Sequence, residues 1–177
     1  MRITTPLLAA TLTLLLPAPS AAAQTATDPA LQEWEVPYSQ SRPRDPMVAP
    51  DGRVWFVGQV GNYVSVLDPK TGSFEKFDMD GGVNPHNLIV DADGTVYYSG
   101  NRASHIGRLD PETGDVEKFM MPDERARDPH TLIFDSMGDV WFTAQNGNFV
   151  GKLWTETGEV RLLETPSAPG RGGRMGS

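Results

Sequence analysis

The chain has 177 residues, of which 23 are acidic and 15 are basic, giving a formal charge of −8, and it contains no cysteine. The negative charge would repel nucleic acid, and the lack of cysteine excludes a disulfide framework, cysteine-ligated zinc and a thiol nucleophile. Small molecules, cations and other proteins remain as partners.

The first 23 residues have the pattern of a secretory signal peptide. Arg2 gives a positive start, residues 6–16 are largely apolar, and small residues precede Gln24. A membrane anchor is the alternative, but this apolar stretch is much shorter than the roughly 20 residues that span a bilayer. We therefore expect a secreted or periplasmic protein that has no membrane contact after cleavage, with residues 24–34 as a linker.

Three copies of one phrase follow along the chain. They read RPRDPMVAPDGRVWFVGQ from residue 42, NPHNLIVDADGTVYYSG from 84 and DPHTLIFDSMGDVWFTAQ from 128, so the spacings are 42 and 44 residues. Each copy holds four short segments of β character, separated by turn sequences such as Asp-Gly and Asp-Pro-x-Thr-Gly. A repeated four-stranded unit of about 40 to 50 residues is the signature of a β-propeller blade. The sequence thus predicts an all-β fold of antiparallel four-stranded blades.

We place the blades at about 35–77, 78–119 and 120–162, within a partial β-propeller that covers 35–165. Propellers close with about four to eight blades. We expect a fourth copy to begin at LLETPSAPG and to be incomplete, so that residues 166–177 are a disordered tail or a truncated blade. Two interpretations stay open: a fragment of a longer propeller, or copies that self-associate through open blade edges.

The second segment of each blade carries two adjacent aromatic residues. One of each pair is expected to pack against the neighbouring blade, because a blade cannot bury both faces alone. An aromatic platform for a ligand is the alternative. The pairs are Trp55 and Phe56, Tyr97 and Tyr98, and Trp141 and Phe142.

These repeats resemble the streptogramin B lyase family, also called virginiamycin B lyases. The resemblance rests on PHTLIFDSMGDVWFTAQNGNFVGKL, on its sister copy from Pro85 and on APDGRVWF in the first copy, and it covers roughly residues 35–165. Members of the family are seven-bladed propellers. The resemblance implies a carbon–oxygen lyase that uses Mg²⁺ to linearise a cyclic depsipeptide lactone by elimination across its ester, without hydrolysis.

The resemblance also implies site residues. In the family, a histidine of the Pro-His phrase acts as a general acid or base, and the matching positions are His130 and His86. Asp128 falls where the family can place an acidic metal ligand. A second acidic residue usually follows the Trp-Phe-x segment, but this chain departs from that pattern with Gly58, Gly100 and Ala144. If the metal needs that carboxylate, these blades lack a complete site.

Each of these residues also has a structural interpretation. His86 and His130 can move a proton near neutral pH, or they can hydrogen-bond a neighbouring blade. Arg44 stands at the same repeat position, where it can bind an anion or pair with a carboxylate. His105, beside a hairpin connection, is expected at the surface. Turn formation is expected for most of the aspartates at positions Asp68, Asp91, Asp93, Asp110 and Asp135, which recur near glycine or proline.

Other functions fit the same repeats. The chain could be a non-catalytic exported propeller that binds a small molecule, a peptide or a protein, an inactive fragment of a longer propeller, or a lactone hydrolase on a related propeller. No G-x-S-x-G motif is present, and no glycine-rich segment sits between a strand and a helix as a nucleotide loop requires. Fold alone does not decide among these functions.

Overall fold

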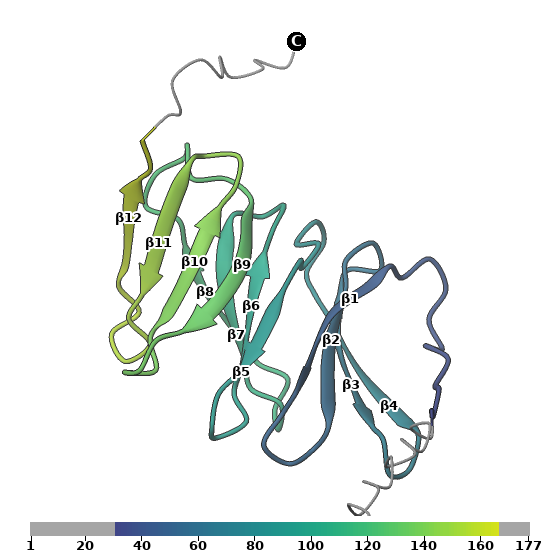
Figure 1. The fold of residues 1–177 in the computed structure, drawn as a ribbon. Helices are drawn as coiled ribbons and strands as arrows, with labels where there is room; N and C mark the ends of the chain where they lie inside the picture. Colours follow the sequence, from purple (N-terminus) through teal and green to yellow (C-terminus); the bar gives the residue numbers. More distant parts are fainter. Residues whose placement is uncertain (1–30, 167–177) are drawn as a thin grey trace, which may run out of the picture. The chain divides into compact units, whose positions relative to one another are not determined.

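The computed structural model describes residues 31–166, and those from Trp34 onward belong to one compact unit. The described residues form twelve strands in three four-stranded sheets (Figure 1). Every neighbouring pair of strands is antiparallel, and each sheet follows the chain order. The predicted all-β partial propeller is therefore confirmed.

Each sheet is one blade, and we call the three the first, second and third blade. The first contains β1 (Pro43–Val48), β2 (Val54–Gly58), β3 (Tyr63–Asp68) and β4 (Ser73–Asp78). The second contains β5 (Leu88–Val90), β6 (Val96–Gly100), β7 (His105–Leu109) and β8 (Val116–Met120). The third contains β9 (Pro129–Phe134), β10 (Val140–Ala144), β11 (Phe149–Leu153) and β12 (Val160–Glu164).

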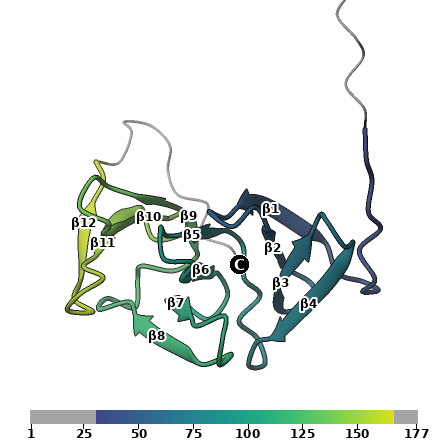
Figure 2. The ribbon, with the colours of Figure 1, turned by 90° about the horizontal axis from the view of Figure 1, so that it is seen from below.

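The blades fan out from their first strands. Strand β5 contacts both β1 and β9, whereas β4, β8 and β12 lie on the outer side of their blades (Figure 2). The first strands are therefore the innermost ones, as in a propeller. Any side chain that recurs at the start of each blade is brought to this inner side.

Turn chemistry accounts for the local folding of each blade. The glycines between the first and second strands, Gly52, Gly94 and Gly138, have φ values of 87°, 92° and 84°. A side chain at such a φ value is strained, so the Asp-Gly and Met-Gly sequences select this turn. The tight turn then pairs the two strands, as the repeats predicted.

Apolar faces hold the blades together. Trp55, which is 1% exposed, stacks on Phe77 at 5.7 Å between ring centroids, within a cluster that joins the first blade to the second. At the next junction Tyr97 meets Phe134 of the third blade edge to face at 5.6 Å. The prediction that one aromatic residue of a pair packs between blades is confirmed at both junctions.

The apparent fourth copy is corrected by the structure. Leu162, Leu163 and Glu164 belong to β12 and pair with β11, so the letters LLE complete the third blade. The expected signal peptide over residues 1–23 lies outside the described residues, as do residues 167–177 of the expected tail. Within residues 31–166 no helix is long and apolar enough to cross a membrane.

Candidate functional site

The two predicted catalytic histidines meet on the inner side of the fan. His86 lies just before β5 and His130 lies in β9, so they come from neighbouring blades. Their ring centroids are 3.5 Å apart, with 40° between the ring planes. His86 is 6% exposed, whereas His130 is half-buried. The structure therefore builds one pair of imidazoles, with one ring more accessible than the other.

Hydrogen bonds within the second blade and between the second and third blades hold this pair in place. The backbone N–H of His86 donates to the Ser99 carbonyl at 3.0 Å, and the Ser99 hydroxyl donates to the His130 carbonyl at 3.0 Å. Asn87 Oδ1 accepts from the backbone N–H of Leu132 at 2.8 Å. Because these bonds fix the backbone beside both rings, the pair is positioned by the framework of the blades.

The environment keeps His86 uncharged at neutral pH. Its pKa is lowered to about 4, mainly by burial and also by the nearby His130 and Arg44, while Asp45 and Asp128 act in the opposite direction. His130 Nδ1 lies 3.2 Å from the Thr131 hydroxyl. A proton taken up by His130 would thus meet a neutral neighbour in the pair.

Arg44 and Asp45 of β1 lie beside His86. Arg44 donates from Nη1 to Gln59 Oε1 at 3.1 Å, and its Nε is 3.4 Å from Asp45 Oδ2. His86 Nδ1 is 3.6 Å from the same oxygen. Asp45 belongs to no motif in the sequence, and its position directly after Arg44 was the available signal. Its φ of 50°, and the irregular register of β1 between Arg44 and Met47, are visible only in the structure.

Asp128, the predicted metal ligand, acts as a link between blades. Its carboxylate accepts hydrogen bonds from the side-chain amides of Asn101 and of Asn146, the latter at 2.9 Å. At the same repeat position Asn84 donates to the Gln59 carbonyl at 2.9 Å. Both residues thus reach back to the end of the preceding blade's second strand and connect neighbouring blades.

An Mg²⁺ ion at Asp128 would have to share a carboxylate that amide groups already hold. Magnesium prefers oxygen ligands and usually takes one or two carboxylates along with water. Both oxygens of Asp128 already accept amide N–H groups. Over the described part of the chain, no group of three or more His, Cys, Asp or Glu side chains could hold a metal ion. Whether the protein uses Mg²⁺ stays a prediction from the family.

At two of the three positions after the aromatic strand, an added Cβ would clash with the ring on the paired strand. At Gly100, an added Cβ would come within 2.8 Å of three ring atoms of His105. Gly58 lies in the same way under Tyr63, and Ala144 is buried opposite Phe149. These small residues make space for the ring on the paired strand, which explains why no carboxylate follows the Trp-Phe-x segment.

The prediction that His105 lies at the surface is wrong. His105 is 1% exposed and begins β7, where the other repeats have Tyr63 and Phe149. Burial lowers its pKa, and its ring faces Tyr98 edge-on at 5.7 Å. His105 is therefore a core residue that occupies an aromatic position of the repeat.

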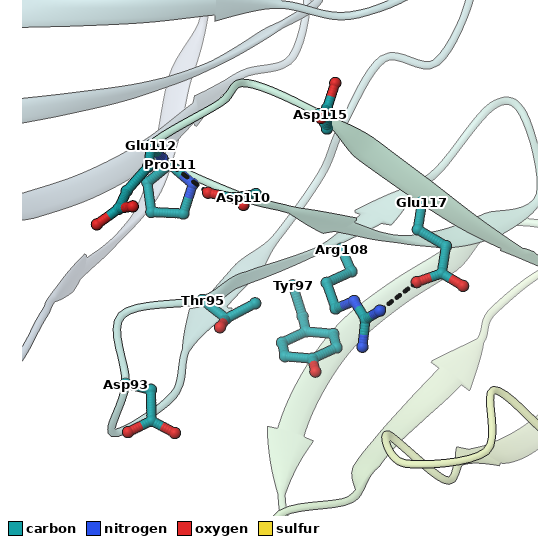
Figure 3. Close-up of a pocket in the computed structure, with 9 residues that line it drawn as sticks. All are labelled: Asp93, Thr95, Tyr97, Arg108, Asp110, Pro111, Glu112, Asp115 and Glu117. Atoms are coloured by element: carbon teal, nitrogen blue, oxygen red, sulfur yellow. Dashed lines mark hydrogen bonds and ion pairs between the residues drawn. The ribbon is translucent and has the colours of Figure 1, made fainter.

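Two polar cavities lie outside the histidine pair. One of about 480 Å³ on the second blade is lined by acidic side chains, together with Tyr97 and with Arg108, which pairs with Glu117 (Figure 3). There Asp110 accepts from the backbone N–H of Glu112 at 2.8 Å. The expected turn role is likewise confirmed for Asp68, Asp91 and Asp135. A second cavity, of about 420 Å³, lies beside Asp128 and is lined by Asn84, Asn101, Arg102 and Arg127.

The fold and the repeated inner position together define a β-propeller with a histidine pair at its inner strands. Residues 20–170 match the model of the virginiamycin B lyase family. The chain belongs to this family.

Solved structures agree with this assignment. A streptogramin B lyase is 28% identical with a TM-score of 0.71, and the match covers 77% of this chain and 45% of that one. A catalytically inactive histidine-to-alanine variant of virginiamycin B lyase from Staphylococcus aureus, solved with quinupristin, is 27% identical with a TM-score of 0.70, over 77% and 46% of the two chains. The present chain thus spans slightly less than half the length of these relatives.

More distant matches show the fold alone. The Kuenenia stuttgartiensis hydrazine synthase is 17% identical with a TM-score of 0.63, over 77% of this chain and 39% of that one. No curated protein matches the chain.

Proposed function

We propose that the chain carries the acid–base part of a carbon–oxygen lyase that linearises a cyclic depsipeptide lactone by elimination. The observation that supports this proposal most directly is the contact between His86 and His130, at 3.5 Å between ring centroids, at the inner strands. Family membership supplies the reaction class. The inactive histidine variant of a relative, solved with quinupristin, shows that a histidine is essential in that protein.

His130 is the proton acceptor in this proposal. Its half-buried imidazole takes the proton from the carbon next to a carbonyl, and the electron pair of that C–H bond forms a carbon–carbon double bond. The bond between the neighbouring carbon and the ester oxygen breaks, and the acid portion leaves as a carboxylate. His130 then returns its proton to solvent.

His86 assists His130 by staying neutral. With a pKa of about 4, it does not place a second positive charge beside the imidazolium that forms on His130. A charged neighbour at this distance would make His130 a weaker base. The pair therefore favours proton uptake by the more accessible ring.

Two further parts of the proposal come from the sequence and the family. Mg²⁺ would supply electrostatic stabilisation of the negative charge that develops on the substrate, and no step above depends on it. Secretion or export to the periplasm is proposed from the pattern of residues 1–23. A cyclic peptide is the ligand that we propose for such an exported, Mg²⁺-dependent lyase.

The test is incubation of the full chain with quinupristin, with and without Mg²⁺, followed by mass spectrometry and absorbance. Elimination opens the ring without a change in mass and creates a conjugated double bond, whereas hydrolysis adds one water. His130→Ala should abolish the product. His105→Phe should retain it, because His105 is a buried core residue in β7, the third strand of its blade. A water-added product, or full activity in His130→Ala, would contradict the proposal.

A non-catalytic binding function is the second candidate. It is favoured by the engaged carboxylate of Asp128 and by the lack, among residues 31–166, of three or more His, Cys, Asp or Glu side chains placed to hold a metal ion. Saturable binding of quinupristin without any product, in the presence of Mg²⁺, would support this candidate over the lyase.

A further inference from the structure

Two nitrogen atoms beside the histidine pair are buried without a hydrogen-bond partner. Within residues 31–166, the buried side-chain atoms without a partner are Arg44 Nε and His86 Nδ1. Buried polar groups in native proteins nearly always have a partner, so two orphaned atoms at neighbouring positions call for an explanation. Both belong to side chains at the same repeat position of successive blades.

Both nitrogens lie around one oxygen of Asp45. Asp45 Oδ2 is 3.4 Å from Arg44 Nε and 3.6 Å from His86 Nδ1. These separations are too long for good hydrogen bonds, although they are short enough for charge to act. Asp45 therefore balances the charge of Arg44 without satisfying either donor. An oxygen atom closer to both nitrogens would do so.

The backbone of β1 brings Asp45 to this place. The register of β1 shifts between Arg44 and Met47, and Asp45 has a φ of 50°. Local irregularities of this kind re-aim side chains and are frequent near functional sites. The Asp45 side chain is 33% exposed, so its carboxylate can turn toward solvent when another group takes its place.

The equivalent residue of the second blade has a different role. Asn87 Oδ1 accepts from the backbone N–H of Leu132 and so ties the second blade to the third. Asp45 also points toward the following blade, but its oxygen approaches His86. Asn87 and Asp45 thus both reach toward the next blade, but Asn87 binds a backbone N–H group whereas Asp45 approaches a side chain. The junction between the first and second blades therefore differs from the junction between the second and third.

We propose that Arg44 and His86 form a subsite for a carboxylate oxygen of the ligand, and that Asp45 is a competitor for this subsite within the protein. His86 would carry its proton on Nδ1 and donate from there, together with Arg44 Nε. This inference rests on the proposed function, in which elimination releases a carboxylate next to His130. The subsite lies beside that base, because the His86 ring contacts the His130 ring.

The competitor explains how product could leave. As the carbon–oxygen bond breaks, negative charge grows on the departing oxygen, and Arg44 stabilises it. Arg44 and Asp45 are neutral as a pair, so a fully formed carboxylate is held only weakly once Asp45 returns. Without Asp45, the carboxylate would be retained by an uncompensated guanidinium.

The test uses sodium acetate as the probe, acetamide as its neutral counterpart, and the full chain at neutral pH and constant ionic strength. Binding is followed by nuclear magnetic resonance at the imidazole of His86 and at nearby backbone amides. Asp45→Asn should tighten acetate binding by about tenfold, because a like charge is removed from the subsite. Arg44→Gln in the Asp45→Asn background should remove this gain. Acetamide binding should respond to neither change.

Matched variants separate a local effect from a general change of charge or fold. Asp51→Asn removes the same charge from another aspartate paired with an arginine in the first blade, and it should leave acetate binding unchanged. Arg44→Lys retains the charge and should keep part of the affinity if Arg44→Gln proves unstable. Equal acetate affinity in the wild type and in Asp45→Asn, or tight binding that persists without Arg44, would overturn the proposal. Acetate binding needs no turnover, so a negative lyase assay does not change the outcome of the acetate test. Likewise, a negative acetate test does not change the outcome of the lyase assay.

Discussion

The outer faces of the first and third blades differ, although the two blades share one repeat. On the first blade, residues 34–38 cover the face that points away from the second blade. Tyr38 packs edge to face on Tyr63 at 5.0 Å, and Trp34 lines a cavity of about 230 Å³ with Phe56 and Phe74. Tyr63 is only 2% exposed as a result. An apolar segment of the chain itself therefore completes the first blade.

On the third blade, the face that points away from the second blade is stabilised by ion pairs. Ile133 is 65% exposed there, and Lys152 Nζ lies 2.9 Å from Asp135 Oδ2 and 2.8 Å from Asp139 Oδ2. Trp141, which pairs with Ile133 and Lys152 in register, donates to Asp135 at 3.0 Å. Lys152 and Trp141 hold the pKa of Asp135 well below its usual range. The comparison teaches that the two faces of a blade, which carry different repeat positions, can be stabilised in different ways, one by apolar packing and the other by ion pairs.

The largest expected effect compares two tryptophans at the same repeat position. Trp55 is 1% exposed between two blades, whereas Trp141 is half-buried on the third blade's outer face. Trp55→Ala should lower the free energy of unfolding by about 3–5 kcal/mol. Trp141→Ala should lower it by about 1 kcal/mol. Urea unfolding of both variants measures the difference, and equal losses would indicate that the third blade's face is covered in solution.

An intermediate effect is expected where the cover of the first blade is weakened. Tyr38→Ala removes the ring that packs on Tyr63 and Phe74, so the free energy of unfolding should fall by about 2 kcal/mol. The exposed rings should also bind more of a hydrophobic dye. Leu163→Ala is the control, because Leu163 is already 59% exposed on the third blade. Unchanged stability in Tyr38→Ala would mean that residues 34–38 do not hold this face closed.

The smallest effect concerns the ion pairs of the third blade. The folded-state pKa of Asp135 is depressed below its ordinary value of 3.8, so its contribution to stability is present above that pH and is lost as the pH falls further. Lys152→Met should remove part of this acid dependence, and added salt should weaken it in the wild type. Thermal unfolding between about pH 2 and pH 7 measures both, with exposed Lys70→Met as the control. If stability fell with decreasing pH in the same way in Lys152→Met as in the wild type, the ion pair between Lys152 and Asp135 would not be the cause of this acid dependence.

Much of the fold could be predicted from the sequence, because turns and strands are local. The Asp-Gly turns, the four-stranded units and the aromatic residues between blades all follow from patterns of a few residues. His105 was mispredicted because its loop-like neighbours outweighed its repeat position, which it shares with Tyr63 and Phe149. Comparison of the three repeats at that position would have indicated a core residue.

The candidate site was predicted only in part. His86 and His130 were identified by their shared phrase, but Asp45 carries no motif of its own. Asp128 was assigned to a metal by resemblance, whereas in the structure its oxygens link to Asn101 and Asn146. Asn101 and Asn146 lie in other segments of the chain, so a local sequence pattern around Asp128 does not predict these hydrogen bonds.

By itself, the sequence determined the repeat, the strands and turns, and the family of this protein. These features depend on backbone preferences and on the alternation of apolar residues within a few positions. Only the tertiary structure decided that the His86 and His130 rings touch and that Asp45 stands between Arg44 and His86. The physical reason is that these distances are set by how the apolar faces of whole blades pack together, so residues about 40 positions apart become neighbours.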